Sequence, residues 1–205
     1  MKIKAIVFDM GNVILQFDYD FFLDREGVFV QEDRELIRNE LFLSVEWAQM
    51  DLGVLDEKTA EPRLLPSFPE HLRQPVKNML YNWADGRNLI PGMDDLVLKL
   101  KTMGYQIYLL SNASFAQHEY WPKYEISRLF DGKLISCDIG IVKPNPEIYR
   151  CFTRKFGLKG EECLFIDDHP ANVAAAIKLG WNGIVFHGDA EKLKQRMKEF
   201  NIYSE

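Results

Sequence analysis

The sequence has 205 residues, which suits one domain with a large insertion or two small domains. Hydrophobic residues make up 47% and charged residues 27%, as in globular proteins and unlike disordered chains. The net charge of −6 argues against a nucleic-acid-binding protein, because such a protein needs clustered Lys and Arg to neutralise phosphates.

The cysteines, histidines and apolar segments argue against further kinds of site and of protein. The three cysteines show no Cys-x-x-Cys spacing and the four histidines form no i, i+4 pair, which argues against a disulfide framework and a zinc site. The first apolar run is too short for a signal peptide, and no later one is long enough to span a bilayer. We therefore expect a cytoplasmic protein without a membrane or nucleic-acid partner. Its oligomeric state stays open.

The first predicted element is a buried strand that ends at Phe8. Asp9 follows at once, and the next residues, including Gly11 and Asn12, suit a tight turn. Asp9 is therefore expected at the carboxyl end of a strand, the edge at which open α/β sheets bind ligands. It is a candidate nucleophile or metal ligand, and a surface Asp that ends a strand is the alternative.

Residues 16–88 show helical periodicity and no convincing strand, which predicts a helical insertion after the first strand. Each proline in the interval is expected to end a helix or to lie in the first turn of the next. These prolines are Pro62, Pro66, Pro69 and Pro75. Several aromatic residues could line a pocket, although such residues at helical spacing are more often core. They are Phe17, Phe21, Phe22, Phe42 and Trp47.

After Pro91 strands and helices alternate. We expect helices at 94–103, 115–129 with a break at Pro122, 146–156, 171–179 and 190–200, and strands at 105–110, 134–136, 163–166 and 183–186. This alternation predicts an α/β fold with a parallel sheet, right-handed crossovers and helices on both faces.

Polar side chains follow three of the predicted strands, at the point where each strand ends. They are Asp9, Ser111-Asn112 and Asp167-Asp168. Since parallel strands carry their carboxyl ends at one edge, we expect these side chains to converge. Lys143 lies in a loop just before a helix and can point a cation into the same site. Each of these residues, considered alone, could instead belong to a turn, cap a helix or be a surface lysine.

This set of side chains suits phosphoryl transfer. Asp9 could attack phosphorus to give an aspartyl-phosphate. Two like charges about 4 Å apart repel by about 4 kcal/mol at an effective dielectric near 20, so the carboxylate needs a metal to approach a phosphate. Oxygen ligands from Asp9, a carbonyl in the following turn and the Asp167-Asp168 pair suit Mg²⁺. Ser111 would bind phosphate oxygens and Lys143 would balance charge.

The sequence resembles the haloacid-dehalogenase-like hydrolase superfamily, which consists mostly of Mg-dependent phosphatases. Four signatures stand in order as Phe8-Asp9-Met10-Gly11-Asn12-Val13, Leu110-Ser111-Asn112, Lys143-Pro144 and Phe165-Ile166-Asp167-Asp168. The resemblance implies a Rossmann-like core of residues 1–15 and 89–205 with a helical cap of residues 16–88. The residues of these motifs, together with Tyr120-Trp121-Pro122, are similar to those of bacterial phosphatases that act on glucose 1-phosphate.

The resemblance also implies roles for the site residues. Asp9 is the nucleophile, Lys143 is catalytic and binds substrate, and Ser111 and Asn112 bind the phosphate. The implied Mg²⁺ ligands are Asp9, the backbone carbonyl of Gly11, Asp168 and Asp167, although Asp167 and Asn172 suit a supporting position behind Asp168 better.

One position departs from the superfamily pattern. Most of its phosphatases carry a second Asp two residues after the nucleophile as general acid, and here that residue is Gly11, which cannot donate a proton. General acid catalysis contributes about 10²–10⁴-fold. Either the leaving group needs less protonation, as in a sugar 1-phosphate, or a cap residue supplies the acid. Asp18 and Asp20 are candidates, and each could instead cap a helix.

Three functions follow as hypotheses. The first is a Mg-dependent phosphatase that acts on a small phosphorylated metabolite such as glucose 1-phosphate. Gly11 favours the second, a phospho-ligand-binding or sensor protein with weak turnover. The third is a metal-independent dehalogenase, which the Asp167-Asp168 pair disfavours because a metal-free site gains little from clustered carboxylates.

Overall fold

The computed structural model describes residues 3–82, 85–86 and 88–203. Within these residues, five parallel strands form one sheet in the order β3-β2-β1-β4-β5. The strands are β1 (Ala5–Phe8), β2 (Gln106–Ser111), β3 (Gly132–Ile135), β4 (Cys163–Asp167) and β5 (Asn182–Val185). Phe8 pairs with Leu109 on one side and with Ile166 on the other, so β1 lies at the centre. The predicted α/β fold with a parallel sheet is confirmed.

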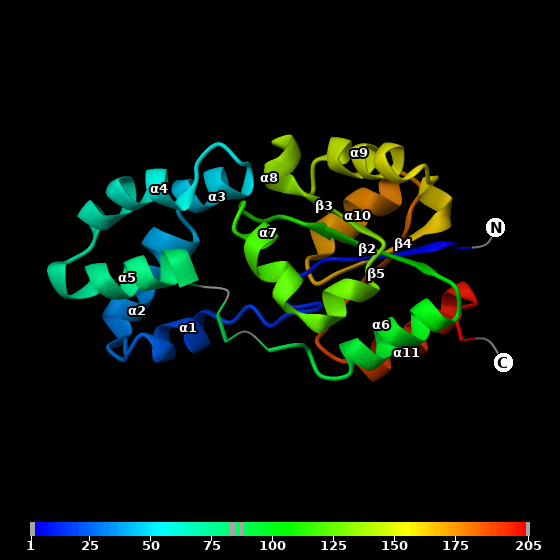
Figure 1. The fold of residues 1–205 in the computed structure, drawn as a ribbon, viewed down its shortest axis with the longest axis horizontal. Coiled ribbons are helices and arrows are strands. Elements are labelled where there is room, and N and C mark those ends of the chain that lie inside the picture. The colour runs from blue at the N-terminus through cyan, green and yellow to red at the C-terminus, as the bar shows by residue number, and fades with distance from the viewer. Residues whose placement is uncertain (1–2, 83–84, 87, 204–205) are drawn as a thin grey trace.

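Helices cover both faces of this sheet (Figure 1). They are α6 (Met93–Thr102), α9 (Pro146–Phe156), α10 (Pro170–Lys178) and α11 (Ala190–Met197). Successive residues of β1 point to opposite faces: Val7 shares a buried cluster with Ile148 of α9, and Ile6 shares another with Val97 of α6. All four residues of β1 are fully buried, as expected for a central strand of a parallel sheet.

Short helical turns form the segment between β2 and β3. The helix expected at 115–129 is α7 (Gln117–Tyr120) followed by two 3₁₀ helices, Trp121–Lys123 and Glu125–Leu129. Pro122 lies at the start of the first 3₁₀ helix, where its missing N–H costs no helical hydrogen bond. The predicted break at Pro122 is therefore confirmed. A further short helix, α8 (Ser136–Ile139), follows β3.

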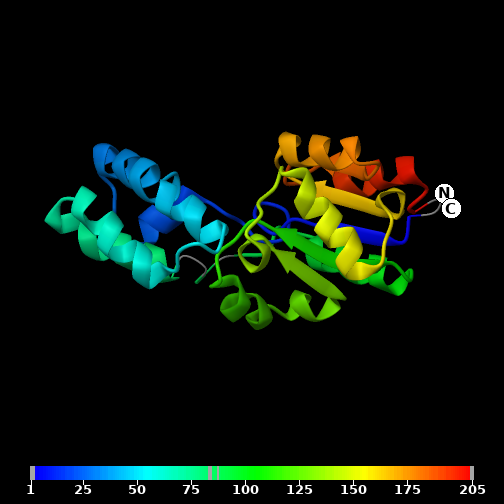
Figure 2. The same cartoon turned by 90° about the horizontal axis from the view of Figure 1, so that it is seen from above.

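The helical insertion lies beside the sheet, beyond the carboxyl ends of the strands and opposite the two chain termini (Figures 1 and 2). Its helices are α1 (Tyr19–Arg25), α2 (Gln31–Ile37), a π-helix at Arg38–Phe42, α3 (Val45–Asp51), α4 (Glu57–Leu64), a 3₁₀ helix at Leu65–Ser67 and α5 (Glu70–Asn82). The described part of this interval contains no strand, as predicted. None of the helices in the described ranges has the length and apolar character needed to cross a membrane.

The chain leaves the sheet and returns to it through two adjacent segments. The backbone N–H of Gln16 donates to the carbonyl of Asn88 at 2.9 Å, and that of Ile90 donates to the carbonyl of Ile14 at 2.9 Å. Leu15 also forms an antiparallel bridge with Leu89. The insertion is thus joined to the sheet by a short two-stranded connection.

The expectation for the prolines of the insertion was wrong at two positions. Pro66 and Pro69 lie at or next to a helix start, but Pro62 lies inside α4 and Pro75 inside α5. An interior proline removes one helical hydrogen bond and costs about 3 kcal/mol. In α5 the burial of an apolar face, formed by Leu72, Val76, Met79 and Leu80, offsets this cost and keeps the helix continuous.

Candidate active site

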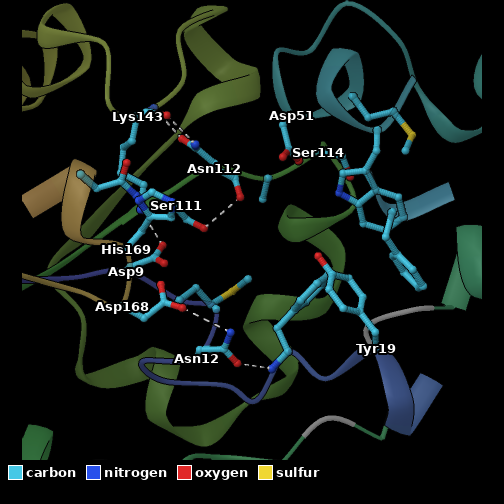
Figure 3. A pocket seen from close by; sticks show the side chains of 18 residues that line it. Asp9, Asn12, Tyr19, Asp51, Ser111, Asn112, Ser114, Lys143, Asp168 and His169 are labelled. Carbon is cyan, nitrogen blue, oxygen red and sulfur yellow. Dashed lines mark hydrogen bonds and ion pairs between the residues drawn. The ribbon is translucent and has the colours of Figure 1, made fainter. Parts of the chain in front are cut away.

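A cavity of about 310 Å³ lies at the carboxyl edge of the sheet, between the sheet and the helical insertion (Figure 3). Asp9 follows β1 directly, Ser111 ends β2 and Asp167 ends β4, so the topology brings the three predicted strand ends together. The predicted residues that line the cavity are Asp9, Gly11, Ser111, Asn112, Lys143, Asp168 and Asn172. Asp167 is fully buried and lies behind the cavity lining.

Lys143 is a buried cation held by three acceptors. Its Nζ lies 2.7 Å from Asp9 Oδ1 and 2.7 Å from Asp167 Oδ2, and it donates to the Leu110 carbonyl at 3.0 Å. Burial acts to lower its pKa, but the charges of Asp9 and Asp167 outweigh burial and raise the pKa above its ordinary value. Lys143 therefore stays charged beside Asp9.

Asp167 lies behind the cavity lining and is itself fixed by hydrogen bonds. Its Oδ1 accepts from the backbone N–H of His169 at 2.8 Å, and both of its oxygens accept from Asn172 Nδ2 at 3.1 Å. With Lys143 on Oδ2, both of its carboxylate oxygens have partners within the protein. These contacts fit the predicted supporting position of Asp167 and Asn172.

Asn112 fixes the backbone of Lys143. Its Nδ2 donates to the Lys143 carbonyl at 3.0 Å, and its Oδ1 accepts from the Lys143 N–H at 2.8 Å. Both atoms of the amide are thus engaged, although Asn112 also lines the cavity. The neighbouring Ser111 is buried and its Oγ makes a long hydrogen bond of 3.5 Å to the Asn112 carbonyl. The Ser111 hydroxyl is therefore the better placed of the two side chains to turn toward a ligand.

We expect Asn112→Ala to lower the free energy of unfolding by about 1–3 kcal/mol, because the backbone of Lys143 loses two hydrogen bonds in a partly buried site. Urea unfolding measures this loss. Ser111→Ala is the matched control, since it removes only a long, weak hydrogen bond, and we expect a loss below about 1 kcal/mol. Equal losses in both variants would show that Asn112 does not hold Lys143.

Carboxylates crowd the edge of the cavity. Ligand oxygens of Asp9, Asp167 and Asp168 all lie within 4.8 Å of one another. Burial raises the pKa of Asp9 to about 7 against the opposing effect of Lys143, and the pKa of Asp168 is raised by burial and by Asp167. Three carboxylates beside one lysine leave an excess of negative charge that a cation would relieve. An all-oxygen donor set suits a hard cation such as Mg²⁺, so these residues fit the predicted metal.

Asp18 and Asp20, the two candidates for a general acid, both lie outside the cavity. Asp18 is the N-cap of α1 and accepts from the backbone N–H of Asp20 at 2.9 Å, as its alternative reading predicted. Asp20 forms ion pairs with Arg34 at 2.8 Å and Arg38 at 3.0 Å. Neither carboxylate lines the cavity. The insertion contributes Asp51 instead, a residue that the sequence reasoning missed because no motif marks the end of α3.

Aromatic rings from the insertion and its connection form the wall opposite the strand ends. Phe17, Tyr19, Phe42 and Trp47 line the cavity, with ring centroids 5.3 Å apart for Phe17 and Tyr19, 4.9 Å for Tyr19 and Phe42, and 5.1 Å for Phe42 and Trp47. Of the five aromatic residues that could line a pocket or belong to the core, Phe17, Phe42 and Trp47 line this cavity. The cavity thus has a charged end at the sheet and an apolar end at the insertion.

The chain is similar to known proteins over most of its length. A family model described as haloacid dehalogenase-like hydrolase matches residues 3–180. Flavin mononucleotide hydrolase 1 of Arabidopsis thaliana is 24% identical over 98% of this chain and 79% of its own length. The sesquiterpene phosphatase astK of Aspergillus oryzae is 24% identical over 88% of both chains.

A solved structure shares the fold. It is an enzyme of the same family from Bacteroides thetaiotaomicron, in complex with magnesium and inorganic phosphate. Its TM-score is 0.70 at 21% identity, covering 93% of this chain and 98% of that one.

Proposed function

The chain belongs to the haloacid dehalogenase-like hydrolase family, and on this basis we propose that it is a Mg²⁺-dependent phosphatase of a small phosphomonoester. The observation that carries the proposal is the buried Lys143 beside Asp9 at the charged end of the cavity. A carboxylate nucleophile must approach a phosphate of like charge, and a fixed cation reduces that repulsion. Relatives named as a flavin mononucleotide hydrolase and a phosphatase support the same reaction.

In the proposed reaction an oxygen of Asp9 attacks phosphorus, and an aspartyl-phosphate forms as the leaving group departs. Lys143 keeps its 2.7 Å contact with Asp9 and balances charge on the nucleophile and the phosphoryl group. The Ser111 hydroxyl binds a phosphate oxygen. Asn112 acts through Lys143, whose backbone it fixes.

The metal ligands are proposed to be Asp9, Asp168 and the backbone carbonyl of Gly11. Asp167, behind the cavity lining, and Asn172, which lines the cavity, contact each other and would support these ligands. When bound, Mg²⁺ neutralises charge on the phosphate oxygens and orients the phosphoryl group. The carboxylate cluster and the magnesium and phosphate bound by the Bacteroides thetaiotaomicron enzyme support this assignment.

Residues 16–88 are proposed to be a cap domain over a core of residues 1–15 and 89–205. The paired connection at Gln16 and Asn88 and the aromatic wall of the cavity support this division. A cavity of about 310 Å³ is at the small end of ligand pockets, which suits a small metabolite. Aromatic rings suit the apolar face of a sugar, so glucose 1-phosphate is the substrate that we would test first.

A phosphate-release screen tests the function. Purified protein is assayed with Mg²⁺ over sugar phosphates, nucleotides and short phosphorylated acids, and Asp9→Asn serves as the blank. We expect the highest kcat/KM for a sugar phosphate. Release that is equal in the wild type and in the blank would overturn the proposal.

Removal of the metal should abolish turnover. We expect EDTA to stop phosphate release and added Mg²⁺ to restore it, because the carboxylate cluster otherwise repels the substrate. Asp168→Asn should raise the Mg²⁺ concentration for half-maximal activity by more than about 10–100-fold, the loss typical of a residue that only supports a metal ligand. Asp18→Asn is the matched control, since this carboxylate lies outside the cavity, and its Mg²⁺ requirement should equal that of the wild type. Undiminished activity in EDTA would contradict the metal assignment.

Gly11 favours a second function, a phospho-ligand sensor with little turnover. Such a protein would bind a phosphorylated ligand with Mg²⁺ in a calorimeter yet release no phosphate above the Asp9→Asn blank. A metal-independent dehalogenase would release halide from 2-haloacids in EDTA, an outcome that the crowded carboxylates disfavour.

A further inference from the structure

Asp51 is the one carboxyl group that the described part of the insertion contributes to the lining of the cavity. It is the last residue of α3. Figure 3 shows it across the cavity from Asp9 and Asp168, on the side of Ser114 and Tyr19. Because the leaving group departs on the side of phosphorus opposite the attacking Asp9 oxygen, it would point toward the part of the cavity that contains Asp51.

Contacts between the insertion and the sheet domain fix this position. The backbone carbonyl of Asp51 accepts from the Oγ of Ser136, the first residue of α8, at 2.5 Å. Ser114 Oγ donates to Glu57 Oε1 at 2.8 Å, which ties the start of α4 to the loop after β2. Gly53 lies so close to the backbone of Cys137 that an added Cβ would be 2.3 Å from the carbonyl oxygen. Asp51 is thus placed over the strand ends by three separate contacts.

The environment of Asp51 keeps a proton available near neutral pH. Burial raises its pKa to about 7, with a smaller raising effect from Asp9 and an opposing effect from Lys143. Asp51 also interacts electrostatically with Tyr19 and Cys137, and burial raises the pKa of each of these two groups above its ordinary value, so both remain neutral. A carboxyl group with a pKa near the working pH suits general acid catalysis.

We propose that Asp51 is the general acid that protonates the leaving group, the role that Gly11 cannot fill. The proposal rests on the phosphatase function proposed above. As the Asp9 oxygen forms its bond to phosphorus, the bond from phosphorus to the leaving oxygen breaks, and that oxygen takes the electron pair and the Asp51 proton. Asp51 is then a carboxylate. It accepts a proton from the water that attacks the aspartyl-phosphate, which releases phosphate and restores Asp9 and the acid form of Asp51.

The test is the dependence of kcat/KM on the acidity of the leaving group. We expect Asp51→Asn to lower kcat/KM by about 10²–10⁴-fold for an alkyl phosphate, whose leaving oxygen needs a proton. The loss should fall below about tenfold for 4-nitrophenyl phosphate, whose leaving group is stable as an anion. The decline of wild-type kcat/KM for the alkyl ester above pH 7, as Asp51 loses its proton, should disappear in the variant.

Controls separate a catalytic role from a structural one. Asp18→Asn changes another insertion carboxylate that lies outside the cavity and should match the wild type with both esters. For Tyr19→Phe, any change in kcat/KM relative to the wild type should be the same for the two esters. Gly11→Asp should restore alkyl phosphate turnover to Asp51→Asn, because a Cβ at residue 11 would meet only Phe17 Cβ, at an ordinary 3.8 Å. Circular dichroism of every variant checks that the fold is kept, and Asp51→Ala, which also lacks an acid, replaces Asp51→Asn with the same expected losses if that protein does not fold.

Equal losses with both esters, or no loss with either, would overturn the role of Asp51 and leave the phosphatase function intact. Failure of the wild type to hydrolyse any ester would overturn the proposed function and the role of Asp51 together.

Discussion

Asp9→Asn is expected to lower kcat by roughly 10⁴-fold or more, because the amide that replaces the carboxylate cannot attack phosphorus. The variant should keep its fold, since Lys143 retains Asp167 and the Leu110 carbonyl as partners. Single-turnover kinetics with a phosphate ester under saturating Mg²⁺ measures the loss. Acid quench of the wild type during turnover should trap the phosphoryl group on the protein, and the variant should trap none.

The control for Asp9 is a carboxylate that belongs to the same protein but not to the cavity. Asp189 caps α11 by accepting from the backbone N–H of Lys192 at 3.0 Å, and it does not line the cavity. Asp189→Asn should therefore retain wild-type kcat. Residual turnover of Asp9→Asn within tenfold of the wild type would rule out Asp9 as the nucleophile.

Lys143→Met should cost both activity and stability. We expect kcat to fall by about 10²–10³-fold, the loss typical of removing one electrostatic partner of a transition state. We also expect the free energy of unfolding to fall by about 3–5 kcal/mol, because Asp9 and the fully buried Asp167 lose their cation. Phosphate release and urea unfolding measure the two effects.

A double variant separates the two effects of Lys143. Lys143→Met combined with Asp167→Asn removes the buried cation and one of its two carboxylate partners, so part of the lost stability should return. Its activity should stay as low as that of the single variant, because Asp9 still lacks a cation. If the single variant unfolds at the same urea concentration as the wild type, the charge pairing of Lys143 contributes nothing to the fold.

In the proposed reaction, Gly11 cannot supply the proton that the leaving group needs. Because residue 11 carries no side chain, the proton for the leaving group has to come from another part of the cavity or from solvent. Asp51 lies on the insertion, whose aromatic residues also line the apolar end of the cavity. In this arrangement the segment that would contact the leaving group would also supply its proton, so substrate choice and acid catalysis would depend on the same helices.

Sequence alone determined the sheet and the convergence of its polar strand ends. Apolar runs that stop at Asp9, Ser111 and Asp167 are local patterns, and the rule that parallel strands share one edge converts them into a site. The same local reasoning predicted the helix at Pro146–Phe156 with its correct bounds, since a proline at the start and a glycine after the end mark it.

Tertiary structure alone decided what faces this site from the insertion. From the sequence, nothing distinguishes Asp18, Asp20 and Asp51 as possible proton donors. In the structure, Asp18 caps a helix and Asp20 forms ion pairs, both outside the cavity. Packing of α3 on α8 brings Asp51 into the cavity lining. The same holds for Pro62 and Pro75, which remain inside helices. These outcomes depend on contacts between residues far apart in the chain, whose energies no local pattern contains.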